Sequence, residues 1–326
     1  MSDSRLGPLR FTPLLKQAIW GGRRLAAFLG RPADHLEDCS ESWDVADLGA
    51  IQTRVLGGPH DGRTLAQLLA THRDELLGPG SSALQFPLLV KWLDATDRLS
   101  LQVHPTDASA AVHHVGQTGK TEAWVIVHAA PDSRLWVGLQ PGVEPNELRL
   151  AIERDDIDSC VPSFAAQTGQ VIVVPAGTVH AIGAGVLLVE IQQPSDITYR
   201  LYDWGRLDTD GQPRPLDLER GLESIDYASG PVQPAQVPSD IDSSGTLVVD
   251  RPEFRVVRHH ITKPSTLAGT NQCRVLTVIE GAGHLRTDDE MLSLAIGDTV
   301  VLPGCLGQVA LSSHDQLTLL ESHPGA

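Results

Sequence analysis

Short polar motifs in the first two thirds of the chain carry the side chains most suited to chemistry. In LSLQVHP, Ser100, Gln102 and His104 alternate with apolar residues, so on a strand they would face one side. Inside a barrel such a face needs partners, because a buried polar group without a hydrogen bond costs about 1–3 kcal/mol. A solvent-exposed face would explain the same pattern, and this motif alone does not decide between the two.

Two further motifs add charged and imidazole groups. In GKTEAW, Lys120 and Glu122 are two residues apart and share one face at the start of the apolar run WVIV. A strand-end ion pair would explain them equally well. In VIVVPAGTVHAIG, Pro175 and Gly177 indicate a tight turn, and His180 begins the next strand. A single histidine after a turn is more often a hydrogen-bonded surface residue than a ligand.

Taken together, these motifs offer a mixed set of oxygen and nitrogen ligands. The candidate metal ligands are Gln102, His104, Glu122 and His180. This combination suits zinc, iron or manganese, and without a thiolate it leaves room for a catalytic ion with an open or water-filled position. We therefore predict one divalent ion in the cavity of a barrel.

A fourth motif, EIQQPSDITYRLYDWGR at 190–206, places Asp196 and Arg200 on one face. The arginine could hold a phosphate or an oxyanion, whereas a structural Asp196–Arg200 ion pair is the simpler explanation. Lys120, Glu190 and Asp196 are candidates for a general base, and the sequence does not choose among them.

The elements that must position these residues are mostly strands. From residue 87 onward, short β-rich runs alternate with turns, which predicts a sandwich or barrel. Leucines at helical spacing predict a helix over 63–77, and 146–167 has the pattern of a small helical insertion. We predict a mainly β chain of two jelly-roll barrels: a catalytic unit over 1–230, a linker over 231–246, and a non-catalytic unit over 247–326.

Composition excludes several classes of function. The 326 residues carry a formal net charge of −16, which argues against a nucleic-acid partner. The longest apolar runs, such as VIVVPA at 171–176, have the length of a strand and not of a membrane span. The first ten residues contain no apolar segment of the kind found in signal peptides, so we expect a cytoplasmic protein. The sequence does not decide between a monomer and a homo-oligomer.

The motifs in this order resemble the type I mannose-6-phosphate isomerases of the cupin superfamily, in their compact bacterial form. The matching stretches lie at 99–105, 119–124, 175–183 and 195–206, with support from WGG at 20–22, ESW at 41–43 and FPLLVKWLDA at 86–95. The resemblance runs from about residue 10 to about residue 230. The chain departs from the longer relatives at Thr121, which replaces a proline, and around Tyr199.

This resemblance implies two cupin-type barrels and one zinc ion per chain, with other divalent metals possible. It implies the metal ligands Gln102, His104, Glu122 and His180. It also implies catalytic and substrate-binding roles for Arg200 and Lys120 and a substrate contact for Ser100. To the substrate-binding set we add Asp196, which shares a face with Arg200.

The implied reaction interconverts mannose 6-phosphate and fructose 6-phosphate through a cis-enediol, with a small sugar phosphate as the partner. Two alternatives remain open at this point. Two histidines and a glutamate also describe the iron site of a cupin dioxygenase, although Gln102 and Lys120 argue mildly against it. A non-catalytic sugar-binding cupin would keep the barrel without turnover.

Overall fold

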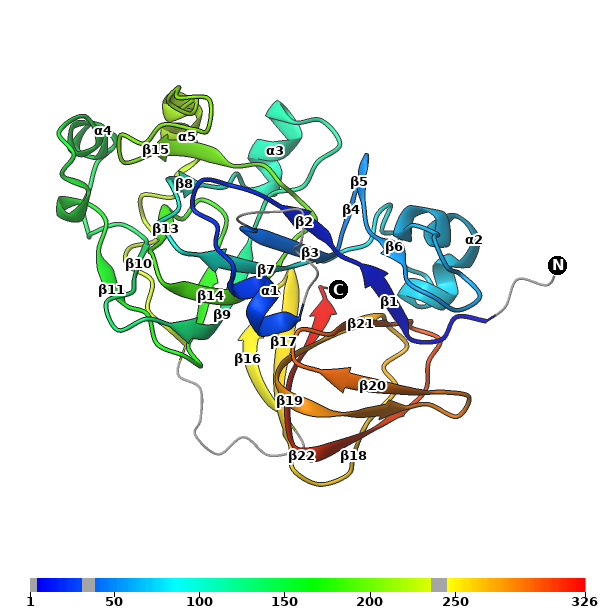
Figure 1. Cartoon of the computed structure of the whole chain (residues 1–326). Coiled ribbons are helices and arrows are strands. Elements are labelled where there is room, and N and C mark those ends of the chain that lie inside the picture. The colour runs from blue at the N-terminus through cyan, green and yellow to red at the C-terminus, as the bar shows by residue number, and fades with distance from the viewer. Residues whose placement is uncertain (1–4, 31–38, 236–244, 326) are drawn as a thin grey trace.

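The computed structural model describes residues 5–30, 39–235 and 245–325, and antiparallel sheets dominate it. Figure 1 shows two β units, with the orange and red strands of the C-terminal unit below the N-terminal unit. Helix α2 (Leu65–Leu77) lies at one side of both. The mainly β plan predicted from the sequence is confirmed.

Two sheets face each other in the N-terminal unit. The six-stranded sheet contains, in spatial order, β12 (Val171–Val174), β9 (Glu122–Ala129), β14 (Val186–Gln192), β7 (Leu89–Ala95), β3 (Glu41–Val45) and β2 (Leu14–Lys16). The five-stranded sheet contains β11 (Ser163–Ala165), β10 (Arg134–Val137), β13 (His180–Ile182), β8 (Leu101–Val103) and β15 (Tyr199–Tyr202). Trp124 and Leu188 of the first sheet pack with Leu135 and Ile182 of the second, so the space between the sheets is a core.

The two central strands of the six-stranded sheet, β14 and β7, are buried on both faces. Every residue of β7 and of β14 is buried, which explains why both strands are apolar along nearly their whole length. Lys91 and Glu190 are among the buried polar residues that interrupt this pattern. They are direct partners across the β7–β14 ladder, so the two charges share one face and stand side by side.

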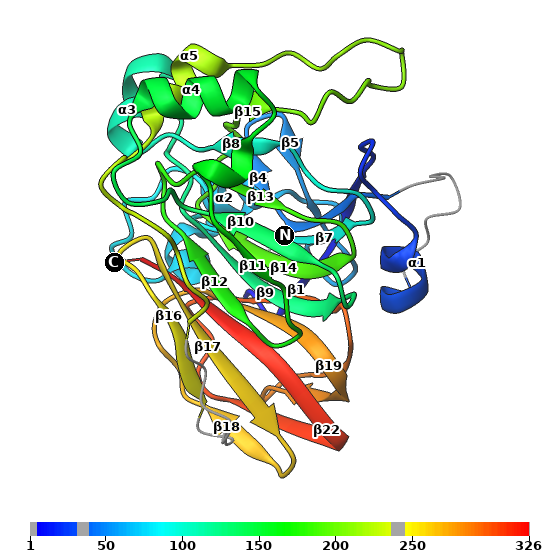
Figure 2. The ribbon, with the colours of Figure 1, turned by 90° about the vertical axis from the view of Figure 1, so that its left-hand side faces the viewer.

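Helices cover the outer face of the five-stranded sheet. Figure 2 shows α3 (Asp107–His113), α4 (Pro145–Glu153) and α5 (Leu218–Ser224) together at the end of the molecule away from the C-terminal unit. Helix α4 and the 3₁₀ turn Ile157–Ser159 fall in the predicted insertion at 146–167. Pro145 at the first helical position suits a helix start, because its missing N–H would have no partner there.

The two other helices have clear end signals. Helix α1 (Arg24–Leu29) ends at Gly30, which adopts the left-handed conformation that glycine tolerates. Helix α2, predicted over 63–77, begins with a capping box in which Thr64 and Gln67 exchange side-chain and backbone hydrogen bonds. Within the described ranges, no helix combines the length and the apolar character needed to cross a bilayer.

The C-terminal unit is built on one nine-stranded sheet that curls around its own core. Its main path contains β16 (Thr246–Asp250), β17 (Phe254–Ile261), β22 (Val309–Pro324), β19 (Arg274–Arg286), β21 (Thr299–Leu302), β1 (Leu9–Thr12) and β6 (Arg54–Val55), and β18 (Ser265–Leu267) and β20 (Met291–Ala295) pair beside it. A separate two-stranded ribbon contains β4 (Asp47–Leu48) and β5 (Ile51–Gln52).

The N-terminal strand β1 joins this C-terminal sheet, since Leu9 pairs with Val301 of β21. The first strand of the chain therefore belongs to the C-terminal sheet, the following segments form the N-terminal unit, and the segments from β16 onward complete the C-terminal unit. Residues 236–244, which make up most of the predicted linker, lie outside the described residues. Pro231 bridges to Gly138 of the N-terminal unit. The boundaries at 230 and 247 stay a prediction.

Candidate active site

Neighbouring strands of the five-stranded sheet bring three of the predicted site residues into one row. His180 of β13 pairs with Gln102 of β8, and Gln102 pairs with Arg200 of β15. Cross-strand partners share a face, so all three belong to the face that looks toward the six-stranded sheet. Ser100 and His104 are 4% and 1% exposed, which rules out the solvent-exposed reading of their motif.

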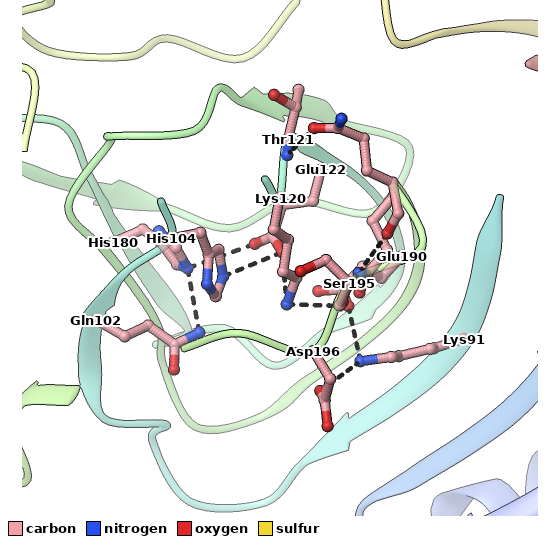
Figure 3. A network of polar contacts seen from close by, with 12 residues as sticks. Lys91, Gln102, His104, Lys120, Thr121, Glu122, His180, Glu190, Ser195 and Asp196 are labelled. Carbon is pink, nitrogen blue, oxygen red and sulfur yellow. Dashed lines mark hydrogen bonds and ion pairs between the residues drawn. The ribbon is translucent and has the colours of Figure 1, made fainter. Parts of the chain in front are cut away.

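The facing sheet contributes Glu122 at the first position of β9. Its Oε2 lies 3.3 Å from Nε2 of His104, and its Oε1 lies 3.4 Å from Nε2 of His180. Gln102 completes the group, with its amide nitrogen 3.1 Å from Nε2 of His180 (Figure 3). The ligand atoms of the two histidines and the glutamate all lie within 4.8 Å of one another.

The protonation states of this group favour a bound cation. Nδ1 of His104 is 2.9 Å from the carbonyl of Ile197, and Nδ1 of His180 is 2.9 Å from that of Thr178. Each Nδ1 therefore carries the proton, and each Nε2 turns a lone pair toward Glu122. Burial lowers the pKa of His104 to about 3 and also lowers that of His180, so both rings are neutral.

The unprotonated Nε2 of His104 therefore faces a carboxylate oxygen of Glu122, so that two lone pairs point toward each other. His104 Nε2 is buried without a hydrogen-bond partner among the described residues, and Glu122 Oε2, which faces it, has an ion pair with Lys120 as its contact to a donor there. Leaving the imidazole nitrogen unpaired costs free energy, and a divalent ion between it and the carboxylate would bind both lone pairs. The donor set of two imidazoles, a carboxylate and an amide thus fits a metal of the zinc, iron or manganese type.

Gln102 reaches this group through its amide, which is held from the other side by Ser100. The Ser100 hydroxyl donates to Oε1 of Gln102 at 3.3 Å. The amide nitrogen now faces His180, and a half-turn of the amide brings the oxygen to the same place. Ser100 therefore orients the amide of a proposed ligand.

Lys120 supplies a buried positive charge beside the ligand carboxylate. Its Nζ lies 3.0 Å from Oε2 of Glu122 and 3.9 Å from Oε1 of Glu190. Burial works to lower the pKa of Lys120, but these carboxylates outweigh burial and raise it above its ordinary value. Burial likewise works to raise the pKa of Glu122, but Lys120 and the histidines hold it well below its usual range. The pair is ionised.

Glu190 is the second buried carboxylate of the site. Burial and the charge of Glu122 raise its pKa to about 7, although Lys120 and Lys91 act to lower it. The indole N–H of Trp124 lies 3.1 Å from Oε1 of Glu122 and 3.3 Å from Oε2 of Glu190. One tryptophan therefore ties the two carboxylates together.

Lys91 is a site residue that the sequence reasoning missed. Its Nζ lies 3.6 Å from Glu41, 3.5 Å from Glu190 and 3.8 Å from Asp196, and it sits 4.2 Å from the ring centre of Trp43. A lysine in the middle of the otherwise apolar run PLLVKWL was the available signal, because a lysine is almost never fully buried without a partner.

The remaining predicted residues lie at the edge of the group. The Asp196 side chain is 51% exposed and contacts Lys91. Arg200 donates from Nη1 to the carbonyl of Pro215 at 2.8 Å, and its Nε is buried without a hydrogen-bond partner in the described part of the chain. No ion pair joins Asp196 to Arg200 in the described ranges, so the simpler explanation of their motif is wrong.

A cavity of about 910 Å³ lies elsewhere, between the two units, where 78–85, Glu253 and Gln272 contribute to its wall. Its lining contains none of the proposed ligands. The donor atoms of the proposed ligands therefore converge outside this cavity.

The chain matches known protein families over most of its length. Residues 9–123 match the family model for the catalytic domain of phosphomannose isomerase type I, and residues 243–324 match that for the cupin domain of mannose-6-phosphate isomerase. Mannose-6-phosphate isomerase ManA of Bacillus subtilis is 36% identical over 309 residues, which cover 94% of this chain and 96% of that protein.

Solved structures share the architecture. The crystal structure of the mannose 6-phosphate isomerase from Bacillus subtilis has a TM-score of 0.86 and 30% identity, and the match covers 98% of this chain and 100% of that one. A mannose 6-phosphate isomerase bound with zinc and yttrium shares the fold at 13% identity, with a TM-score of 0.74 and coverage of 98% and 100%. The predicted cupin fold is confirmed. The chain belongs to the family of type I mannose-6-phosphate isomerases.

Proposed function

We propose that the chain interconverts mannose 6-phosphate and fructose 6-phosphate with one zinc ion held by Gln102, His104, Glu122 and His180. Family membership supports the isomerase reaction. The single observation that carries the metal proposal is the meeting of buried imidazole and carboxylate lone pairs with no proton between them. Zinc is preferred because its ligands in proteins include these groups and because a related isomerase was solved with zinc bound.

The reaction moves a proton between C1 and C2 of the sugar through a cis-enediol. A bound divalent ion supplies Lewis-acid stabilisation of the negative charge on the enediolate oxygens. Lys120, which stays protonated, adds a fixed positive charge beside the ligand carboxylate. Its raised pKa removes it from the candidates for the general base.

Glu190 and Asp196 remain as candidate bases. Glu190 has the better matched acidity, since a carboxylate with a pKa of about 7 is about half ionised at neutral pH and accepts a proton more readily than an ordinary carboxylate. Asp196 has the better access, since half of its side chain is exposed. We propose Glu190 as the base, with Asp196 as the alternative.

The alternatives weighed from the sequence receive no support. Family membership does not favour a dioxygenase or a non-catalytic sugar binder. The amide of Gln102 beside the two imidazoles and Glu122 makes a four-ligand set, whereas the facial triad of non-haem iron has three protein ligands. We also propose the cytoplasm as the compartment, because a charged sugar phosphate does not cross an apolar bilayer unaided.

The decisive test compares turnover with and without metal. We expect chelator-stripped protein to lose isomerase activity on mannose 6-phosphate by at least about 1,000-fold, since Lewis-acid stabilisation contributes several kcal/mol. One equivalent of zinc should restore turnover. Oxygen uptake is the control measurement for the dioxygenase. Metal-stripped protein that keeps full turnover, or zinc-loaded protein that binds the sugar phosphate without converting it, would contradict the proposal.

Arg200 is proposed to grip the phosphate, and this predicts a particular kinetic change. Arg200→Met should raise KM by about 10- to 100-fold, because a charged hydrogen bond contributes about 1.5–3 kcal/mol. The kcat should change less than threefold, roughly, since such binding is uniform in ground and transition states. Arg200→Lys keeps the charge but loses the two parallel N–H donors of the guanidinium group. Its KM should therefore lie between that of the unsubstituted protein and that of Arg200→Met. A fall in kcat at constant KM would place Arg200 at the reacting oxygens instead.

A further inference from the structure

The turn between β16 and β17 of the C-terminal unit contacts the strand that carries Glu122. The hydroxyl of Thr121 donates to Oε1 of Glu253 in this turn at 3.0 Å. Thr121 stands between Lys120 and Glu122, so it points to the opposite side of the chain from both. Figure 3 shows its side chain directed away from the cluster of proposed ligands. Glu253 therefore contacts the residue beside Glu122 from the side opposite to the proposed ligands.

The same hydroxyl also connects to the segments of the two histidines. It accepts a hydrogen bond from the backbone N–H of Ala176 at 3.2 Å, in the turn that leads to His180. The next residue, Gly177, donates its N–H to the carbonyl of His104 at 2.8 Å. Thr121 is 2% exposed, so water has little access to replace these bonds. One buried hydroxyl therefore joins the backbones that present three of the four ligands.

Glu253 is held in place within its own unit. Its carbonyl accepts from the N–H of Gly325 at 2.9 Å, and the next residue, Phe254, is fully buried. Oε2 of Glu253 lies 3.5 Å from Nε of Arg251. The carboxylate thus belongs to a turn that is tied to the C-terminal unit, and its bond to Thr121 connects that turn to the residue before β9.

We infer that Glu253 is a positioning residue of the metal centre, acting through the Thr121 hydroxyl. This inference rests on the metal site proposed above. Hydrogen-bond partners behind metal ligands fix the orientation of those ligands, and their loss weakens metal binding by about 10- to 100-fold. A carboxylate acceptor makes the stronger, charge-assisted kind of bond. The second barrel therefore contributes to zinc affinity without supplying a ligand.

The test measures zinc dissociation constants of the full-length protein by competition with a chromophoric chelator. Thr121→Val and Glu253→Ala should each weaken zinc binding by about 10-fold, the low end of the range for such partners. Thr121→Ser and Glu253→Gln keep a donor and an acceptor and should stay within about twofold of the unsubstituted protein. The double variant T121V/E253A should bind zinc about as well as T121V alone, because T121V already removes the bond to Glu253 together with the bond from Ala176.

A matched control comes from a second hydrogen bond between the units. The hydroxyl of Thr299 on β21 donates to Asp44 of β3 at 2.7 Å, and β3 carries none of the proposed ligands. Thr299→Val should lower the melting temperature about as much as T121V and leave zinc affinity unchanged. The inference fails if T121V and E253A bind zinc within twofold of the unsubstituted protein, or if Thr299→Val weakens binding equally. An unsubstituted protein that binds no zinc would instead refute the metal centre itself, and the inference with it.

Discussion

Glu122→Gln is expected to lower kcat by at least about 1,000-fold and to abolish stoichiometric zinc binding. The carboxylate reaches both histidine Nε2 atoms, at 3.3 and 3.4 Å, and no other acidic side chain of the described chain makes both contacts. Glutamine keeps the shape but supplies a neutral amide, which is a much weaker ligand. Loss of a stabilisation of about 4 kcal/mol corresponds to about three powers of ten in rate.

The measurement pairs the isomerase assay with metal analysis of the purified variant. Glu280→Gln is a suitable control, because Glu280 lies on β19 of the C-terminal unit and bonds only to Gln316 and Thr318 among the partners the structure describes. That control should keep turnover and zinc. A Glu122→Gln protein that holds one zinc and retains more than a tenth of the kcat would show that the carboxylate is not a ligand.

Lys120→Met has the second largest expected effect on turnover, and unlike Glu122→Gln it should leave zinc bound. We expect kcat to fall by about 100- to 1,000-fold, the range for removing one preorganised electrostatic group from an active site. Zinc should remain bound, because the lysine is no ligand and its charge repels a cation placed at Glu122. Turnover and metal content therefore separate in this variant, whereas they fall together in Glu122→Gln.

The pH profile supplies a second readout for Lys120→Met. Lys120 acts to lower the pKa of Glu190, which is about 7 with the lysine in place. Without the lysine, that pKa rises, and Glu190 is ionised only at higher pH. If Glu190 is the base, the acidic limb of kcat/KM should shift upward. Lys263→Met, on an exposed turn, is the control and should change neither quantity. An unshifted limb with normal kcat would remove Lys120 and Glu190 from the mechanism.

Much of the candidate site could be read from local sequence patterns. Alternation in LSLQVHP places Gln102 and His104 on one face, because side chains along a strand alternate by stereochemistry alone. The same rule pairs Lys120 with Glu122. Residue types then restrict the metals, since imidazole, carboxylate and amide donors have fixed preferences. These inferences need no knowledge of distant contacts.

Other features depend on pairings that no local pattern encodes. Glu190 meets Lys91 because β14 and β7 pair in one particular register, and a shift by one residue would place them on opposite faces. Strand β1 joins the C-terminal sheet although it is almost 300 residues from β21 in sequence. The partners of Lys91 could not be inferred from its own segment for this reason, and neither could the bond between Thr121 and Glu253.

The sequence by itself determined the types of ligand, their grouping on strand faces and the mainly β class, because each follows from local periodicity and side-chain chemistry. The tertiary structure alone decided that these faces look inward, that Glu122 stands opposite His104 and His180, and that the second barrel contacts the strand behind them. The physical reason is that strand register and sheet packing are set by the sum of many distant contacts, each too weak to be read from its own segment.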